Sequence, residues 1–290
     1  MSAQTKAGAR VAAPLSIRDA LYEAPGPKTR MKIRIGTAVS AVLVALLLGF
    51  VVYRFWATGQ LDPRYWEFFT WGSTWAYLMA GLRGTLTVAL TAGAIALVLG
   101  LALMLGRTSG MRWLAALCRV VTDFFRGVPS LLLIYFFFLV VPQYGIRMSS
   151  FWMITLPVAL AASGVLAEVF RAGMNAVPCG QTEAALALGV RPFRVKLKIV
   201  LPQAIRYVIP SLISQLVVVV KDTTVAYVVS YPDMLQNARV LITNYDALVS
   251  TYLVVAVIYI LLNYAINQLS VYVARRSGTR VVSRYSTSPA

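Results

Sequence analysis

The sequence predicts an all-α, polytopic membrane protein with about six transmembrane helices. Three observations support this fold class. Of the 290 residues, 59% are hydrophobic and only 13% are charged, which is too apolar for a soluble domain. Several uncharged stretches reach the roughly 20 residues that a helix needs to cross the hydrocarbon core. Finally, Lys and Arg are concentrated in alternate connecting segments, as in membrane proteins of fixed orientation.

The expected spans follow one another along the chain in a simple order. Five are uncharged, and a sixth qualifies only if Lys221 and Asp222 are tolerated inside it. In chain order the six are Ile35 to Tyr53, Gly84 to Gly106, Gly127 to Ile146, Met148 to Ala167, Tyr207 to Pro232 and Ala247 to Ala274. An even number of spans predicts that both termini lie on the same side.

The distribution of basic residues predicts which side that is. If the N-terminus is cytoplasmic, 21 of the 27 Lys and Arg residues fall in cytoplasmic segments and five in outer segments, with Lys221 inside the membrane. Because basic loops are retained in the cytoplasm, both termini and the segment around residues 181–200 are predicted to be cytoplasmic. The expected location is the bacterial plasma membrane.

Composition excludes several other classes of protein. The net charge of +17 does not indicate nucleic-acid binding, because the basic residues lie between apolar runs rather than on one polar face. Two cysteines and no histidine give neither a disulfide framework nor a zinc site. The sequence has no G-x-x-x-x-G-K-[ST] phosphate-binding loop and no nucleophile–base–acid set, so we expect a non-catalytic chain.

The segments outside the spans differ in character. Residues 1–34 form a basic N-terminal segment, with a short helix expected around Ile17 to Glu23, and residues 35–56 form the first membrane helix. The aromatic segment 57–82 predicts an interfacial helix along the outer surface, with a carbohydrate-stacking platform as the alternative. Residues 277–290 predict a disordered cytoplasmic tail.

The segment 181–200, predicted to be cytoplasmic, contains residues that are typical of the starts and ends of two helices. Glu183 lies in a first helical turn, where the helix dipole favours an acid, and Gly189 follows the last turn. Pro192 suits the start of a second helix, and Pro202 is expected to end it. The first helix is expected to present Ala184, Ala185 and Leu188 on one side. On physical grounds the segment either rests on lipid headgroups or docks onto a cytoplasmic partner.

The residues here resemble a known family. Glu183-Ala184-Ala185, three residues, Gly189, nine residues and Ile199-Val200-Leu201-Pro202 match the EAA signature of permease subunits of binding-protein-dependent ABC importers. The resemblance implies that residues 181–200 are coupling helices that insert into an ATP-hydrolysing subunit. The implied ATPase contacts are Glu183, Ala184, Ala185, Leu188, Gly189 and Arg191.

Flanking segments resemble the polar-amino-acid subfamily of these permeases. They are "RGTLTVAL", "FRGVPSLLLIYF", "AEVFRAG", "GQTEAALALG", "LPQAIRYVIP" and "VVKDTTVAYVV". The resemblance implies a five-helix permease core of the type I importer kind over residues 83–276, so that the helix at 35–56 is an addition. The leader "LYEAPGPKTRMKIR" and this helix are similar to actinobacterial permeases of glutamate-type systems. At Val165-Leu166 this sequence departs from the subfamily, whose members usually carry Tyr-Thr directly before the Ala-Glu pair.

The resemblance also implies partners. They are a dimer of ATP-binding subunits, a second and related permease subunit, an extracytoplasmic amino-acid-binding protein and the lipid bilayer. No cofactor is expected on this chain, because ATP and Mg would be bound by the ATPase. The implied activity is ATP-driven import of a polar amino acid, with glutamate as the first candidate. The alternatives are a stand-alone secondary transporter or channel, and a non-transporting assembly subunit.

Two groups of charged residues are candidates for the path and its gates. Lys221 and Asp222, with Thr223 and Thr224 beside them, lie within the fifth span, where charges exposed to lipid would cost several kcal/mol. They either contact an amino-acid substrate, or neutralise each other or pair with another subunit to hold the bundle together.

The second group lies at the inner ends of spans. Glu168 and Arg171 are three residues apart and predict a helical ion pair that steadies the start of the coupling segment, with gating as the alternative. Arg126, Gly127 and Pro129 predict a bend at the inner end of the third span.

Overall fold

The computed structural model describes residues 26–276, and these form helices and turns with no strand. The chain divides into two compact units at Leu61 and Asp62, which we treat separately. The short helix expected around Ile17 to Glu23 and the tail 277–290 lie outside the described residues.

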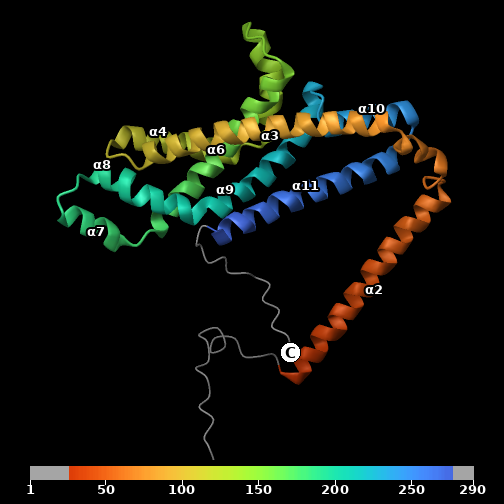
Figure 1. Ribbon diagram of the computed structural model, residues 1–290, viewed down its shortest axis with the longest axis horizontal. Coiled ribbons are helices and arrows are strands. Elements are labelled where there is room, and N and C mark those ends of the chain that lie inside the picture. The colour runs from red at the N-terminus through yellow and green to blue at the C-terminus, as the bar shows by residue number, and fades with distance from the viewer. Residues whose placement is uncertain (1–25, 277–290) are drawn as a thin grey trace, which may run out of the picture. The chain divides into compact units, whose positions relative to one another are not determined.

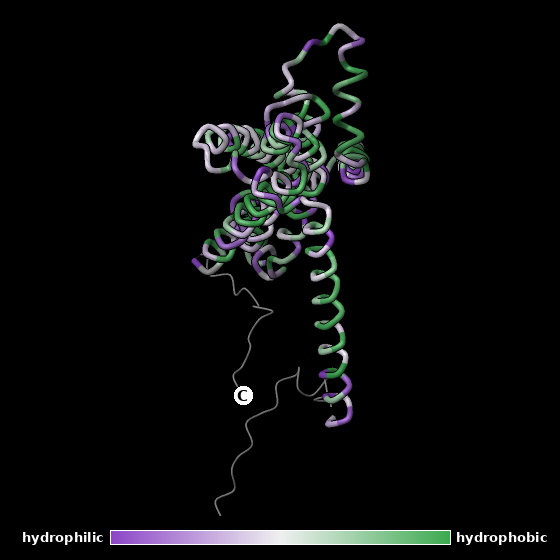
Figure 2. The backbone as a smooth tube through the Cα atoms, turned by 90° about the vertical axis from the view of Figure 1, so that its right-hand side faces the viewer, coloured by the Kyte–Doolittle hydropathy of each residue, from purple (hydrophilic) through white to green (hydrophobic). Residues whose placement is uncertain are grey.

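The first unit is one long helix, α2 (Pro27–Ala57). Pro27 at its first position fits the fixed φ of proline, and a left-handed Gly59 follows its end. The helix is longer than the expected span 35–56 because it includes the basic residues 28–34. Figure 2 shows hydrophilic residues at its start and hydrophobic ones along most of its length.

The outer aromatic segment does not form the expected interfacial helix. It makes two short 3₁₀ helices, η1 (Pro63–Tyr65) and η2 (Glu67–Thr70), and the residues from Gly72 onwards already belong to α3 (Gly72–Arg107). The cause is local packing: Phe68 is only 2% exposed and its ring stacks on Tyr245 at 4.5 Å between centroids. The segment is therefore folded onto the protein.

The centre of the second unit is the contact between α3 and α6 (Ser150–Ala176). Small residues make this contact close: a Cβ at Gly100 would come within 2.9 Å of the Leu166 Cβ. The helices α4 (Arg112–Gly127) and α9 (Leu201–Thr223) pack against this pair, and α11 (Leu248–Arg276) packs against α9 (Figure 1). The buried core is mostly Ala, Val, Ile and Leu.

The third expected span is a bent structure. It consists of α5 (Ser130–Tyr135), the π-helix η3 (Phe136–Val140) and the 3₁₀ helix η4 (Val141–Tyr144). At Val128 and Pro129 it bends by 98° from α4, and only the two together are long enough to cross. In the described residues, five helices could each span a membrane, or six spans if this bent pair counts as one.

The expectation that Pro202 ends a helix is wrong. The chain continues helically through α8 (Pro192–Val195), the π-helix η5 (Lys196–Val200), α9 and the 3₁₀ helix η6 (Thr224–Val229). A proline ring clashes with the carbonyl four residues earlier in a regular α-helix. The wider π turn directly before Pro202 relieves that clash, so one continuous run links the coupling segment to the membrane.

The two ends of the second unit carry different short helices. α7 (Cys179–Ala187) and α8 lie together at one end, and α10 (Met234–Tyr245) lies at the other (Figure 1). Asp233 caps α10 by accepting a 2.7 Å hydrogen bond from the Gln236 N–H.

Candidate coupling surface and substrate path

The end of α7 is a Schellman motif centred on Gly189. The N–H of Gly189 donates to the Leu186 carbonyl at 2.9 Å, and the N–H of Val190 donates to the Ala185 carbonyl at 3.1 Å. Gly189 has a φ of 76°, a left-handed conformation that side chains resist. The bend expected at this glycine is therefore fixed by backbone geometry.

One side of the coupling segment forms a small core of its own. The residues buried there are Val177, Ala185, Val195, Val200 and Ala204. The expectation that Ala185 shares an exposed side with Ala184 and Leu188 is wrong, since Ala185 is only 5% exposed. It follows Ala184 by one residue, or about 100° around the helix, which turns it inward.

The opposite side exposes apolar groups together with charged ones. Leu188 is 84% exposed and Phe193 is 70% exposed, while Glu183, Ala184 and Arg191 are also on the surface. Phe193 was not among the expected contacts, although an aromatic residue directly after Pro192 is a visible signal. Exposed apolar residues on a segment that has its own buried core and a fixed bend are typical of a surface that a partner covers.

An ion cluster joins α3, α4 and α6. The Glu168 carboxylate accepts a hydrogen bond from Arg107 at the end of α3, and another from the Arg171 Nε at 2.7 Å. Arg126 at the end of α4 lies 3.6 Å from the same carboxylate, and 4.0 Å from Asp123.

The pair expected from the spacing of Glu168 and Arg171 is thus formed, but as part of a larger group. Arg107 was missed because it is 61 residues from Glu168. Gly127 ends α4 and Pro129 precedes α5, so both stand at the bend next to this cluster.

The four residues expected to line a path do not act as one group. Lys221 is exposed, Asp222 is partly buried and hydrogen-bonded by the Ser130 side chain, and Thr223 is fully buried. Among the described residues no ion pair includes Lys221 or Asp222, so the idea that they neutralise each other is not supported by the geometry.

The hydroxyls of Thr223 and Thr224 both donate hydrogen bonds to backbone carbonyls three residues earlier. Thr223 donates to the Val220 carbonyl at 2.8 Å and Thr224 to the Lys221 carbonyl at 2.6 Å. Ser130, which directly follows Pro129, was missed because nothing in the sequence links it to Asp222. Lys221 is therefore the member of the group that is free to meet a ligand or a partner subunit.

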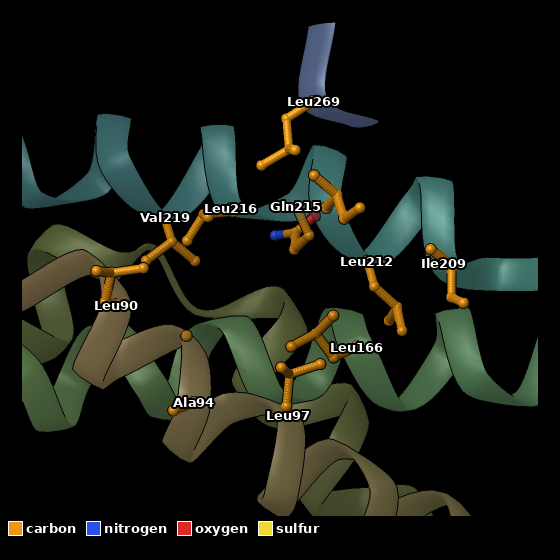
Figure 3. A pocket seen from close by; sticks show the side chains of 12 residues that line it. Leu90, Ala94, Leu97, Leu166, Ile209, Leu212, Gln215, Leu216, Val219 and Leu269 are labelled. Carbon is orange, nitrogen blue, oxygen red and sulfur yellow. The ribbon is translucent and has the colours of Figure 1, made fainter. Parts of the chain in front are cut away.

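An apolar pocket of about 430 Å³ lies between α3, α6, α9 and α11 (Figure 3). Leucines dominate its lining, and Gln215 is its one polar side chain. An amino acid brings an ammonium and a carboxylate, and both need charged or hydrogen-bonding partners away from water. The lining does not supply them, so this pocket does not fit a polar amino acid.

Comparison with known proteins places this geometry in context. The family described as binding-protein-dependent transport system inner membrane component matches residues 96–278. The glutamate transport system permease protein GluD of Corynebacterium glutamicum is 37% identical over 226 residues, covering 75% of this chain and 81% of the relative. The arginine transport system permease protein ArtQ of Bacillus subtilis is 30% identical, covering 56% and 74%.

Two solved structures share the fold. An amino acid ABC transporter crystallised with histidines is 25% identical with a TM-score of 0.68, covering 72% of this chain and 98% of that chain. The inward-facing MetNI methionine ABC transporter is 18% identical with a TM-score of 0.60, covering 71% and 99%, and shows a likeness of fold alone.

Proposed function

Because this chain belongs to the family of binding-protein-dependent transport system inner membrane components, we propose that it is the permease subunit of an ATP-driven importer for polar amino acids. Glutamate is the first candidate substrate, since the glutamate permease GluD is a relative that covers most of the chain. Permeases named for glutamine and arginine transport support the wider class of polar amino acids.

ATP hydrolysis belongs to a separate chain in this proposal. The sequence lacks a Walker-type phosphate-binding loop, so ATP and Mg would be held by a dimer of ATPase subunits. A second, related permease would complete the path, and a binding protein would deliver the substrate outside. Both termini would lie in the cytoplasm, on the side where most basic residues fall.

The observation that carries the proposal is the rigid coupling segment. Its bend is fixed at Gly189, its inner side has its own core, and its exposed side offers Leu188 and Phe193. These features favour a protein partner over lipid headgroups. A stand-alone transporter or channel does not need such a surface. For an assembly subunit without a path, mutations of Lys221 or Asp222 should affect only assembly.

The continuous helical run suggests how movement would be passed on. From Pro192 to Lys221 the chain remains helical, a length of about 44 Å at 1.5 Å per residue. When ATP closes the ATPase dimer, its clefts would move the coupling segment as a rigid body. The same helical run would tilt α9 and carry Lys221 with it.

Lys221 is the residue that we assign to the path. It is exposed although it lies in a membrane-spanning helix, and a lysine facing lipid at that depth is costly. It would therefore face an aqueous path or the second permease. Asp222, held by Ser130, would support the wall of the path rather than bind substrate.

Replacing Gly189 by Val tests the proposal. A β-branched residue strains the left-handed conformation, although no neighbouring atom lies within 4 Å of the added carbon. We expect normal amounts in the membrane and loss of ATP-driven uptake. Gly145→Val is the matched control, because Gly145 has a similar φ of 79° but follows η4 at the predicted outer side. Retained uptake by Gly189→Val would contradict the assigned role of the coupling segment.

A further inference from the structure

The outer end of the fifth span follows a three-residue period. Val220, Thr223, Ala226 and Val229 are buried, which is a spacing of three. On the other side lie Lys221, Thr224, Tyr227 and Ser230, which we call the polar stripe. In a 3₁₀ helix residues three apart eclipse each other.

Backbone hydrogen bonds confirm this geometry. The N–H of Thr224 donates to the Lys221 carbonyl, and the N–H of Ser230 donates to the Tyr227 carbonyl at 3.2 Å. At a rise of about 1.5 Å per residue as far as Thr224 and about 2 Å per residue beyond it, Tyr227 lies roughly 10 Å beyond Lys221 along the helix. Because the stripe begins at a lysine that cannot face lipid, the whole stripe faces the same aqueous or protein surroundings.

The stripe ends at a polar pocket between η6 and α10. This outer pocket is shallow and open to its surroundings, with a volume of about 450 Å³. Ser230, in a left-handed conformation, ends η6 and turns the chain toward α10. The polar lining consists of Tyr227, Ser230, Gln236, Arg239, Thr243 and Asn244.

The outer pocket contains a positive charge and no negative charge among its lining residues. The Arg239 guanidinium lies 4.6 Å from the centre of the Tyr227 ring, a cation–π contact that holds it over the pocket. None of the lining residues is acidic. Hydroxyl and amide groups surround the guanidinium and can donate to a second anionic group. A net negative ligand is therefore matched better than a neutral or basic one.

We propose that the outer pocket binds a carboxylate of an acidic amino acid before the substrate reaches Lys221. The inference rests on the proposed importer function and adds a substrate class and a second binding position to it. Arg239 pairs with one carboxylate, while the side-chain amides of Gln236 and Asn244 donate to the other. The ammonium donates a hydrogen bond to the Ser230 hydroxyl, and the polar stripe leads inward to Lys221.

The test measures uptake by the complete complex in proteoliposomes. Binding protein loaded with labelled glutamate is supplied at saturation, so that its own affinity does not set the rate. Arg239→Gln removes the charge, and we expect glutamate uptake to fall about tenfold or more, as for loss of a charge-assisted hydrogen bond. Arg239→Lys keeps the charge and should retain an intermediate rate.

Arg64→Gln is the matched control. Arg64 lies 4.4 Å from the centre of the Tyr65 ring and is exposed, but it does not line the outer pocket. We expect it to transport within about twofold of the unchanged protein. The concentration of binding protein that half-maximally stimulates ATP hydrolysis should be the same for Arg64→Gln and Arg239→Gln.

Three outcomes would overturn the proposal. Arg239→Gln could transport like Arg64→Gln, in which case the pocket binds no substrate. It could instead raise the half-maximal concentration of binding protein, which would make Arg239 a contact for that protein. Finally, Arg239→Lys could assemble normally but transport no better than Arg239→Gln, in which case the pocket does not act through its positive charge. An unchanged complex with no ATP-dependent uptake would instead overturn the proposed function itself.

Discussion

The helix α6 and the run from α8 to η6 both contain charged residues in the membrane-spanning part of the protein. The acid in α6 is paired within the described chain, whereas the lysine in the run is not. In α6, 67% of an apolar 18-residue stretch is buried, and Glu168 is paired with arginines from α3, α4 and α6. In the run Pro192–Val229 only 28% of such a stretch is buried, and Lys221 has no ion pair among the described residues.

The difference separates structural charge from functional charge. A charge that is satisfied inside the chain contributes to folding, and its loss should be seen first in stability. A charge that is exposed in a span needs a partner outside the chain. We therefore expect changes in α6 to affect assembly and changes in the α8–η6 run to affect transport.

The largest effect is expected at Glu168. Glu168→Ala leaves Arg107 partly buried without its acid, and breaking such a pair costs on the order of 3 kcal/mol. Because the group keeps some contact with solvent, the loss should be at the lower end of the range for buried pairs. Thermal unfolding in detergent and the amount of assembled complex measure it. Asp123→Ala, at an exposed 4.0 Å pair, should change stability little; an equal loss in both variants would remove the distinction.

The next effect compares two glycines on α3. A Cβ at Gly100 would meet Leu166 Cβ at 2.9 Å and the Ala167 backbone nitrogen at 3.1 Å, so Gly100→Ala should destabilise by about 1–3 kcal/mol. A Cβ at Gly93 would meet only the end of Leu216, on α9, at 3.4 Å. Gly93→Ala should be close to neutral in the same unfolding measurement. The reverse order would mean that α9, not α6, is the tightly packed neighbour of α3.

A third change tests the α8–η6 run. Lys221→Ala should leave the amount and thermal stability of the complex unchanged, because no ion pair is lost within the described chain. Uptake per complex should fall about tenfold or more, and Lys221→Arg should restore part of it. Normal uptake by Lys221→Ala would place this charge outside the path.

The smallest effect is expected at Asp233, an acid that differs from Glu168 because no arginine is paired with it among the described residues. Asp233 is buried, and no group hydrogen-bonds to its Oδ2. Burial raises the pKa of Asp233 to about 6, although the backbone N–H groups at the start of α10 act against this; Tyr231 and Tyr259 are the titratable neighbours. Within residues 26–276 no cation is paired with this carboxylate.

A pKa raised in the folded state favours the protonated form, so stability should increase as pH falls through about 6 toward 4. Between pH 7 and pH 5 the gain should be on the order of 1 kcal/mol. Asp233→Asn can still cap α10 and should lose this dependence. Thermal unfolding at the two pH values is the measurement, and an unchanged dependence in Asp233→Asn would assign it to another group.

Local patterns predicted the parts of the molecule that local chemistry determines. Apolar run length gave the order of the spans, and the position of Gly189 gave the bend of the coupling segment, because a left-handed cap depends on neighbouring residues. The sequence could not show that Arg107 reaches Glu168 or that Ser130 reaches Asp222, since both contacts join distant parts of the chain.

Two errors have more specific causes. Pro202 was expected to end a helix, but the π turn before it allows the helix to continue. Lys221 to Thr224 were expected to act together, but consecutive residues point in different directions around a helix. The 3₁₀ period that places Tyr227 in line with Lys221 could not be anticipated from a 3.6-residue pattern.

The most direct test of the central claim is uptake of labelled glutamate into proteoliposomes that hold this chain with its ATPase, second permease and binding protein. Uptake should require ATP on the side of the coupling segment and should persist when ion gradients are abolished. Glutamine, arginine and histidine, supplied in parallel, would define the range of substrates. Uptake that continues without the ATPase subunits and stops when the ion gradient collapses would contradict the account.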